Sequence, residues 1–277
     1  MRIDLHAHST RSDGTDTPAE LMAAAATAGL DVVALTDHDT DRGWDEAAGA
    51  VQSTGVSLVR GAEVTSSWQG GSQHILSYLH EPARLAPLLA ENRLRRPRRA
   101  RAMVERLSED FPITWEDVLA QAGDPSTVGR PHMADALVAA GSYPDRNAAF
   151  AAALKKSARY YVDIAVRTPV EVVEAIVAAG GVAVLAHPFM ARRAAPLSDA
   201  EIGELAEAGL FALEADHRDH TPAQRERARA LAGQLGVAVT GSSDYHGTGK
   251  PNRLGEGLTS PDVLEAVESA GHLPVLR

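Results

Sequence analysis

Short apolar runs alternate with amphipathic segments in the first eighty residues of the chain. A strand is predicted from Arg2, and apolar, β-branched runs at 31–36 and 56–60 are typical of buried parallel strands. A fourth strand is expected at 72–79. The segments between them predict helices at 18–29 and 44–54, the first with Thr17 as its cap and Pro18 in its first turn.

The amino-acid composition and the predicted secondary structure change after Glu81. Residues 82–165 are rich in Ala and Arg and predict helices with breaks at proline, first at Pro97, and no buried strand. Strands and helices alternate again from Thr168. Further strands are expected at 182–186, 210–215 and 237–241, with a short final one at 273–276.

Seven or eight strands, mostly followed by helices, favour a (β/α) barrel over an open sheet. We therefore expect two domains. One is a barrel built from residues 1–79 and 167–277, and the other is a helical insertion or cap at 80–166.

Composition narrows the chemistry. The chain has 277 residues, no cysteine and a formal net charge of −10. Disulfides and thiolate metal sites are excluded, so any metal must be held by His, Asp and Glu, a set that suits Zn, Mn or Fe without choosing among them. The acidic charge argues against coating long duplex DNA. The N-terminus does not resemble a signal peptide and no apolar run is long enough to span a bilayer, so a cytoplasmic protein with no membrane partner is expected.

Metal-ligand residue types recur at the predicted strand ends. In the first motif, His6 and His8 project to the same side of a strand because alternate residues do so. Any one of these residues, taken alone, is more often a helix cap or a solvated loop residue. Their repetition at several strand ends, which a barrel brings to one mouth, predicts a shared metal site; the residues are His6, His8, Asp13, His38, Glu63, His74, His187, Asp244 and His246.

These motifs together resemble the PHP (polymerase and histidinol phosphatase) family. They are H-A-H-S with S-D-G, T-D-H-D, G-A-E followed by a histidine eleven residues later, A-H-P, and S-D-Y-H-G. The resemblance covers about 1–79 and 167–277, and every motif position is filled. It implies a distorted seven-stranded, TIM-like (β/α) barrel with a trinuclear metal centre. We expect two or three divalent ions to be bound in this chain.

The resemblance also implies how the ligands divide and what they do. His6, His8, Glu63 and Asp244 would hold one ion, and Glu63 would bridge to a second ion bound by His74 and His187. Asp13, His38 and His246 would hold the third; with Glu63 they are the expected catalytic residues. Clustered divalent ions bind phosphate and activate water, so a phosphoesterase needs no Ser or Cys nucleophile.

Substrate contacts are predicted less directly. Arg130 and His132 lie in a G-R-P-H stretch that resembles one in small stand-alone bacterial members of the family, where Arg130 would clamp a phosphate through its planar guanidinium. A surface helix cap is the alternative for this stretch. His217 follows a strand end and is a further candidate. Six arginines between 93 and 101 either receive extra phosphates or form a solvated helix face. His80 and His272 are expected at the surface.

A metal-dependent phosphoesterase acting on small nucleotides is the favoured function. Its substrates would be a nucleoside monophosphate, a 3′,5′-bisphosphate or the end of a short oligoribonucleotide. A histidinol-phosphate phosphatase and a non-catalytic metal-binding module are the alternatives. The sequence names neither the exact substrate nor the oligomeric state.

Overall fold

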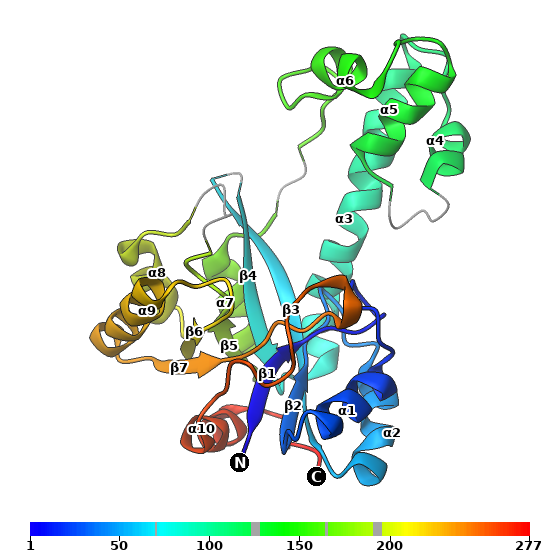
Figure 1. Cartoon of the computed structure of the whole chain (residues 1–277). Coiled ribbons are helices and arrows are strands. Elements are labelled where there is room, and N and C mark those ends of the chain that lie inside the picture. The colour runs from blue at the N-terminus through cyan, green and yellow to red at the C-terminus, as the bar shows by residue number, and fades with distance from the viewer. Residues whose placement is uncertain (70, 123–127, 164–165, 191–195) are drawn as a thin grey trace. The chain divides into compact units, whose positions relative to one another are not determined.

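The computed structural model describes all residues except 70, 123–127, 164–165, 191–195 and the side chain of Arg96 (Figure 1). The chain divides into two compact units. The barrel unit comprises Met1–Leu89 and Val166–Arg277, and the helical unit comprises Ala90–Ala165. Each is described separately below.

The barrel unit is built on one sheet of seven strands that follow one another in chain order. All neighbours are parallel except β3–β4 and β4–β5, which are antiparallel. The first and last strands approach each other where the His8 amide donates to the Tyr245 carbonyl over 2.8 Å, so the barrel is nearly closed. The predicted barrel fold is confirmed; its strands are β1 Ile3–Ala7, β2 Val32–Leu35, β3 Ser57–Trp68, β4 Gly71–Tyr78, β5 Val182–Leu185, β6 Ala212–Asp216 and β7 Ala238–Gly241.

Among the described residues of the barrel unit, six α-helices lie wholly within it, and four of them begin at a capping box. Thr17 accepts a hydrogen bond from the Glu20 amide while the Glu20 side chain binds the Thr17 amide, and the same reciprocal box opens α7, α8 and α9. These boxes satisfy amides that would otherwise lack partners at a helix start. The helices are α1 Pro18–Thr27, α2 Trp44–Thr54, α7 Pro169–Ala178, α8 Asp199–Glu207, α9 Pro222–Leu235 and α10 Pro261–Ala270.

Two strand predictions need correction. β3 does not end near residue 60 but continues to Trp68, because it forms an antiparallel hairpin with β4 in which Thr65 faces His74. The segment 273–276 forms only an isolated bridge between Leu58 and Leu276. Glu63 therefore lies within a strand rather than after one, and the hairpin decides where it points.

The helical unit packs around its own apolar cluster, which includes Met103, Leu107, Met133 and Leu137. Its helices are α4 Trp115–Ala122, α5 Arg130–Ala139, α6 Arg146–Ala149 and the π-helix Phe150–Leu154, together with the greater part of α3, Pro82–Ser108. The break predicted at Pro97 is wrong. A proline inside a helix removes one backbone hydrogen bond and often ends the helix. Here α3 nevertheless continues through Pro97 as one helix of 27 residues.

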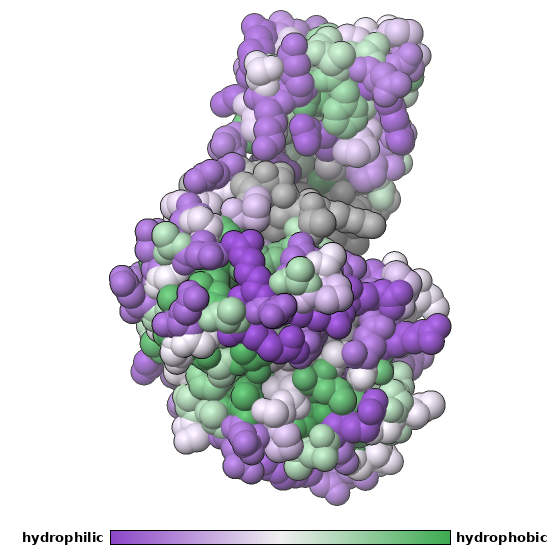
Figure 2. Space-filling view, turned by 60° about the vertical axis from the view of Figure 1, so that its left-hand side comes forward, coloured by the Kyte–Doolittle hydropathy of each residue, from purple (hydrophilic) through white to green (hydrophobic). Residues whose placement is uncertain are grey.

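The surface is predominantly polar on the face that Figure 2 shows, with apolar residues in small separate areas. Among the described residues, the exposed large hydrophobic side chains are Met1, Leu94 and Val177, which are far apart in the sequence. Of the described helices, none combines the length and the apolar character needed to cross a bilayer.

His80 was expected at the surface but is fully buried. It follows β4, and it is packed against Trp44 and close to Gly181. Its Nδ1 lies 2.8 Å from Ser77 Oγ, and its ring centroid is 4.9 Å from that of Trp44. Burial lowers the pKa of His80 to about 4, although a hydrogen bond from its ring to the Ser77 backbone opposes the shift.

We expect His80 to make the protein sensitive to acid between pH 6.5 and about 4. In that window the unfolded chain takes up a proton that the folded state resists, so stability falls as the pH falls. Between pH 7 and 4.5 the loss due to His80 is about 2 kcal/mol. Urea unfolding of metal-free wild type and His80→Gln at both pH values measures it. His272→Gln, at an exposed histidine, is the control; an equal loss in wild type and His80→Gln would contradict the assignment.

Candidate metal centre

Glu63, in the middle of β3, is the point on which the predicted ligands converge. Its carboxylate is fully buried. One oxygen, Oε2, lies 3.1–3.2 Å from nitrogens of His6, His8 and His38. The other, Oε1, lies 2.7 Å from His74 Nδ1 and 3.2 Å from His187 Nε2. Five imidazoles from four segments of the chain thus surround one carboxylate.

The hairpin explains why His74 reaches this point although it lies at the start of its strand. β4 runs opposite to β3, so its first half lies at the end of the barrel where the parallel strands finish. His187 and Asp244, which follow β5 and β7, have left-handed backbones, with φ of 32° and 53°. Such conformations cost energy in residues other than glycine and are concentrated at functional sites.

β1 supplies His6 and His8, both fully buried. Their Nε2 atoms lie 3.0 Å apart, and Asp244 Oδ1 is within 3.4 Å of both. The register between β1 and β2 shifts between Asp4 and Ala7. An irregularity of this kind redirects side chains and is frequent beside active sites.

Asp13, His38 and His246 form a more open part of the centre. The Asp13 side chain is 53% exposed, and its oxygens lie 3.2 Å from His246 Nε2 and 3.8 Å from His38 Nε2. Gly14 is required directly after Asp13, because a Cβ there would lie 2.5 Å from the carbonyl oxygen of His8.

In the part of the chain that the structure describes, four groups of ligand atoms lie close enough together to hold a cation. The group His6, His8, Glu63 and Asp244 has the composition that the family resemblance implies for one ion. His8 joins Asp13, His38 and His246 in a second group, whereas His74 and His187 fall into different groups. The structure brings all nine predicted ligands together, and the division among ions stays a prediction.

The electrostatics favour ionised carboxylates. Burial alone would raise the pKa of Glu63, but the imidazoles of His38, His74 and His6 outweigh it and hold that pKa well below its usual range. Burial would likewise raise the pKa of Asp244, but the charge of His6 outweighs it and the pKa of Asp244 is strongly lowered. Both groups therefore carry the charge that a metal ligand needs at neutral pH.

Cations fit this donor set. His6 Nδ1 contacts the ionised Glu214, which can only accept, so Nδ1 donates and Nε2 faces Glu63. Burial lowers the pKa of His6, but Glu63 and Glu214 outweigh it and hold that pKa well above its usual range, so a cation bound at Nε2 would take the place of a proton. Among the described residues, Glu63 Oε2 and His246 Nε2 are buried without a hydrogen bond of good geometry, although other site residues lie within 3.2 Å of both. Lone pairs that converge in a buried site are costly unless a positive charge lies among them.

Glu214, on β6, is a site residue that the predicted ligand set missed. It is fully buried and contacts His6 Nδ1 at 3.0 Å, the His187 amide at 2.8 Å and the Ser242 hydroxyl. The available signal was a lone carboxylate in an apolar strand. A carboxylate that binds the far nitrogen of a ligating histidine fixes the orientation of its ring.

Glu214→Gln is expected to weaken metal binding about 10- to 100-fold. The amide cannot match the charge that holds the His6 ring with Nε2 toward Glu63. Titration of metal-free protein with Mn²⁺ measures the loss. Glu256→Gln, a change at a partly exposed carboxylate that pairs with Arg218, is the control; equal affinities of the two variants would contradict this role for Glu214.

The predicted substrate residues lie in both units. In the helical unit, Arg130 donates to the Leu154 carbonyl at 3.1 Å, and His132 Nδ1 accepts the Gly129 amide at 3.2 Å as part of a helix cap. His217 belongs to the barrel unit, and its Nε2 lies 3.6 Å from Asp244 Oδ2. The roles of these three residues in substrate binding stay predictions.

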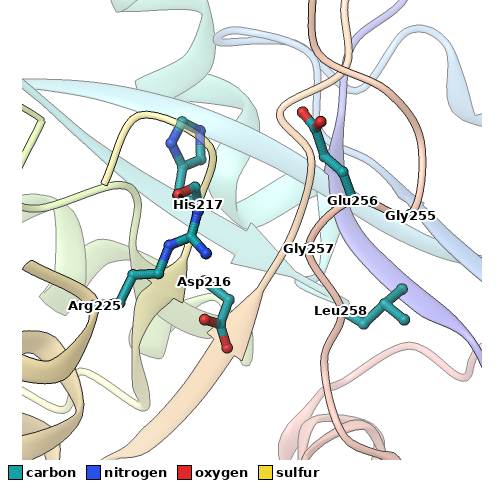
Figure 3. Close-up of a pocket in the computed structure, with 7 residues that line it drawn as sticks. All are labelled: Asp216, His217, Arg225, Gly255, Glu256, Gly257 and Leu258. Atoms are coloured by element: carbon teal, nitrogen blue, oxygen red, sulfur yellow. Dashed lines mark hydrogen bonds between the residues drawn. The ribbon is translucent and has the colours of Figure 1, made fainter. Parts of the chain in front are cut away.

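His217 also borders a cavity of about 310 Å³ (Figure 3). Arg225 reaches across it to donate to the His217 carbonyl at 3.0 Å. Two of the lining carboxylates are already paired, Asp216 with Arg229 and Glu256 with Arg218. The cavity is therefore lined largely by charged and polar groups. Of its lining residues, His217 is the one that contacts the metal centre. The other lining residues are Gly255, Gly257 and Leu258.

Comparisons with known proteins agree with this geometry. The PHP domain model matches residues 4–111. A 3′,5′-nucleoside bisphosphate phosphatase of Chromobacterium violaceum is 31% identical over 91% of this chain and 89% of its own length. A 5′-3′ exoribonuclease of Haemophilus influenzae is 30% identical over 88% and 90%.

Two solved structures cover almost the whole chain. A candidate metal-dependent phosphoesterase of Bifidobacterium adolescentis has a TM-score of 0.75 and 44% identity, over 97% of this chain and 96% of that one. A protein of Chromobacterium violaceum described as an amidohydrolase has a TM-score of 0.72 and 30% identity, over 100% and 98%. With its ligand cluster and its full-length relatives, this chain belongs to the PHP family and is a metal-dependent phosphoesterase.

Proposed function

We propose that the protein removes or cleaves phosphate esters of small nucleotides. The candidate substrates are nucleoside monophosphates, nucleoside 3′,5′-bisphosphates and the ends of short oligoribonucleotides. The cluster of nine ligand groups, with five imidazoles around Glu63, carries the proposal for the chemistry. The activities of two relatives that match about nine-tenths of this chain, a nucleoside bisphosphate phosphatase and an exoribonuclease, support the nucleotide class. A cytoplasmic location is part of this proposal.

The ligand set would hold two or three divalent ions, of which Mn, Zn and Fe suit His, Asp and Glu. Such ions supply Lewis-acid activation of a phosphate ester and of water. The chain's own part is to fix the donors. Glu214 orients His6, the β3–β4 hairpin brings His74 to Glu63, and Asp13 with His246 leaves one side of the cluster open.

A hydrolysis screen tests the proposal, with inorganic phosphate measured for monoesters and released mononucleotides measured for the RNAs. Purified protein loaded with Mn²⁺ is assayed against nucleoside monophosphates, 3′,5′-bisphosphates, 5′-phosphorylated short RNAs, sugar phosphates and histidinol phosphate. We expect nucleotide substrates to have the highest kcat/KM. A preference for histidinol phosphate would replace the nucleotide assignment, and hydrolysis that survives both chelation and His38→Ala would contradict the metal-dependent mechanism.

A further inference from the structure

Lys250 lies beside the metal centre without being one of the predicted ligands. Its Nζ is 3.0 Å from Asp244 Oδ2. The lysine side chain is 41% exposed, whereas that of Asp244 is 4% exposed. Within the described parts of the chain, no other lysine or arginine forms an ion pair with the carboxylates of the centre; these are Asp13, Glu63, Glu214 and Asp244.

The two oxygens of Asp244 face different surroundings. Oδ1 lies 3.4 Å and 3.3 Å from the Nε2 atoms of His6 and His8, with which it forms a ligand group. Oδ2 faces Lys250 and lies 3.6 Å from His217 Nε2. The Lys250 ammonium therefore contacts one oxygen of Asp244 from the solvent side, while the other oxygen faces the histidines of the metal centre.

The backbone around Lys250 is tied to the barrel on both sides. Asp4 accepts the amides of Ser243 at 3.0 Å and Gly255 at 2.8 Å. Asn252 donates to the Ser243 carbonyl at 2.7 Å. Ahead of the lysine, the Thr248 amide donates to Thr15 Oγ1 at 2.8 Å, next to Asp13. This framework holds the Lys250 backbone in place, while its four-carbon stem leaves the ammonium free to turn.

We propose that Lys250 binds a non-bridging oxygen of the substrate phosphate, moving from Asp244 Oδ2 to the phosphate as substrate enters. This inference rests on the proposed hydrolysis of phosphate esters. A phosphate dianion competes well for an ammonium whose present partner, Asp244, shares its charge with the metal centre. Lysine is a common phosphate binder that acts as a compact point charge.

Binding of inorganic phosphate to Mn²⁺-loaded protein tests this role directly. Three variants are compared with wild type by calorimetry: Lys250→Met, which keeps the stem, Lys250→Arg, which keeps the charge, and Arg253→Met. Arg253 is an exposed cation in the same loop, so its removal changes the net charge equally. We expect Kd to rise about tenfold or more in Lys250→Met, as the loss of one charge-assisted hydrogen bond predicts. It should stay within about threefold of wild type in Lys250→Arg and Arg253→Met.

Metal content and kinetics separate this role from simple support of Asp244. We expect Lys250→Met to retain the wild-type number of Mn²⁺ ions and to show a higher KM for nucleotide. Loss of Mn²⁺ from Lys250→Met, or equal phosphate affinities in Lys250→Met and Arg253→Met, would overturn the proposal. If wild type hydrolyses no phosphate ester, the proposed function fails, while the calorimetry still decides whether Lys250 binds phosphate.

Discussion

Replacing Glu63 with glutamine is expected to lower kcat/KM about 1,000-fold or more. The substitution keeps the size of the side chain but removes the one charge that five imidazoles share. A divalent ion contributes several kcal/mol to a phosphoryl-transfer transition state, and each 1.36 kcal/mol is a factor of ten in rate. Steady-state kinetics with Mn²⁺ in excess, together with metal analysis of the purified variant, measures the effect.

Glu81→Gln is a suitable control for this experiment. Glu81 is a carboxylate of the same barrel unit that pairs with Arg84, and its loss should change activity by less than about twofold. Circular dichroism establishes that both variants are folded. A Glu63→Gln enzyme that keeps full activity and a full complement of metal would remove Glu63 from the centre of the site.

Chelation should abolish phosphate release and lower the melting temperature. Metal-free protein must keep Glu63, Asp244 and Glu214 buried with only protonated imidazoles to balance their charge. An ion present at 1,000 times its Kd stabilises the folded state by about 4 kcal/mol, which corresponds to about 10 °C for a chain of this size. Thermal denaturation before and after EDTA measures the shift.

Addition of Mn²⁺ or Zn²⁺ to the chelated protein should restore both activity and melting temperature. Mg²⁺ is a useful comparison because it prefers oxygen ligands and a near-octahedral site, so we expect it to restore less at equal concentration. Activity that is unchanged after exhaustive dialysis against EDTA, in protein shown to be metal-free, would contradict a metal-dependent mechanism.

The sequence predicted the barrel correctly because its signals are local. The apolar runs at β2 and β5 and the capping boxes at α1 and α8 depend on residues within one or two turns of each other. The positions of His6, His187 and Asp244 near strand ends were visible for the same reason. Strand ends of a barrel meet at one mouth, so these positions alone predicted a shared site.

The direction of β4 was not visible in the same way. Its apolar residues fit a strand of either orientation, and only pairing with β3 and β5 makes it antiparallel. That pairing extends β3 to Trp68 and turns His74 toward Glu63, and packing against Trp44 buries His80. Pairing between strands is a tertiary interaction, so the hydrophobic periodicity within one strand does not predict its direction or its partner.

The contacts of Glu214 and Lys250 likewise come from the tertiary structure. Glu214 reads from the sequence as one carboxylate in an apolar strand, and Lys250 as one cation in a loop. Their partners, His6 and Asp244, lie elsewhere in the chain or on the far side of a turn. The sequence by itself determined which residue types gather at the mouth of the barrel. The tertiary structure decided which atoms face one another there, because burial and strand pairing fix side-chain directions that local patterns leave open.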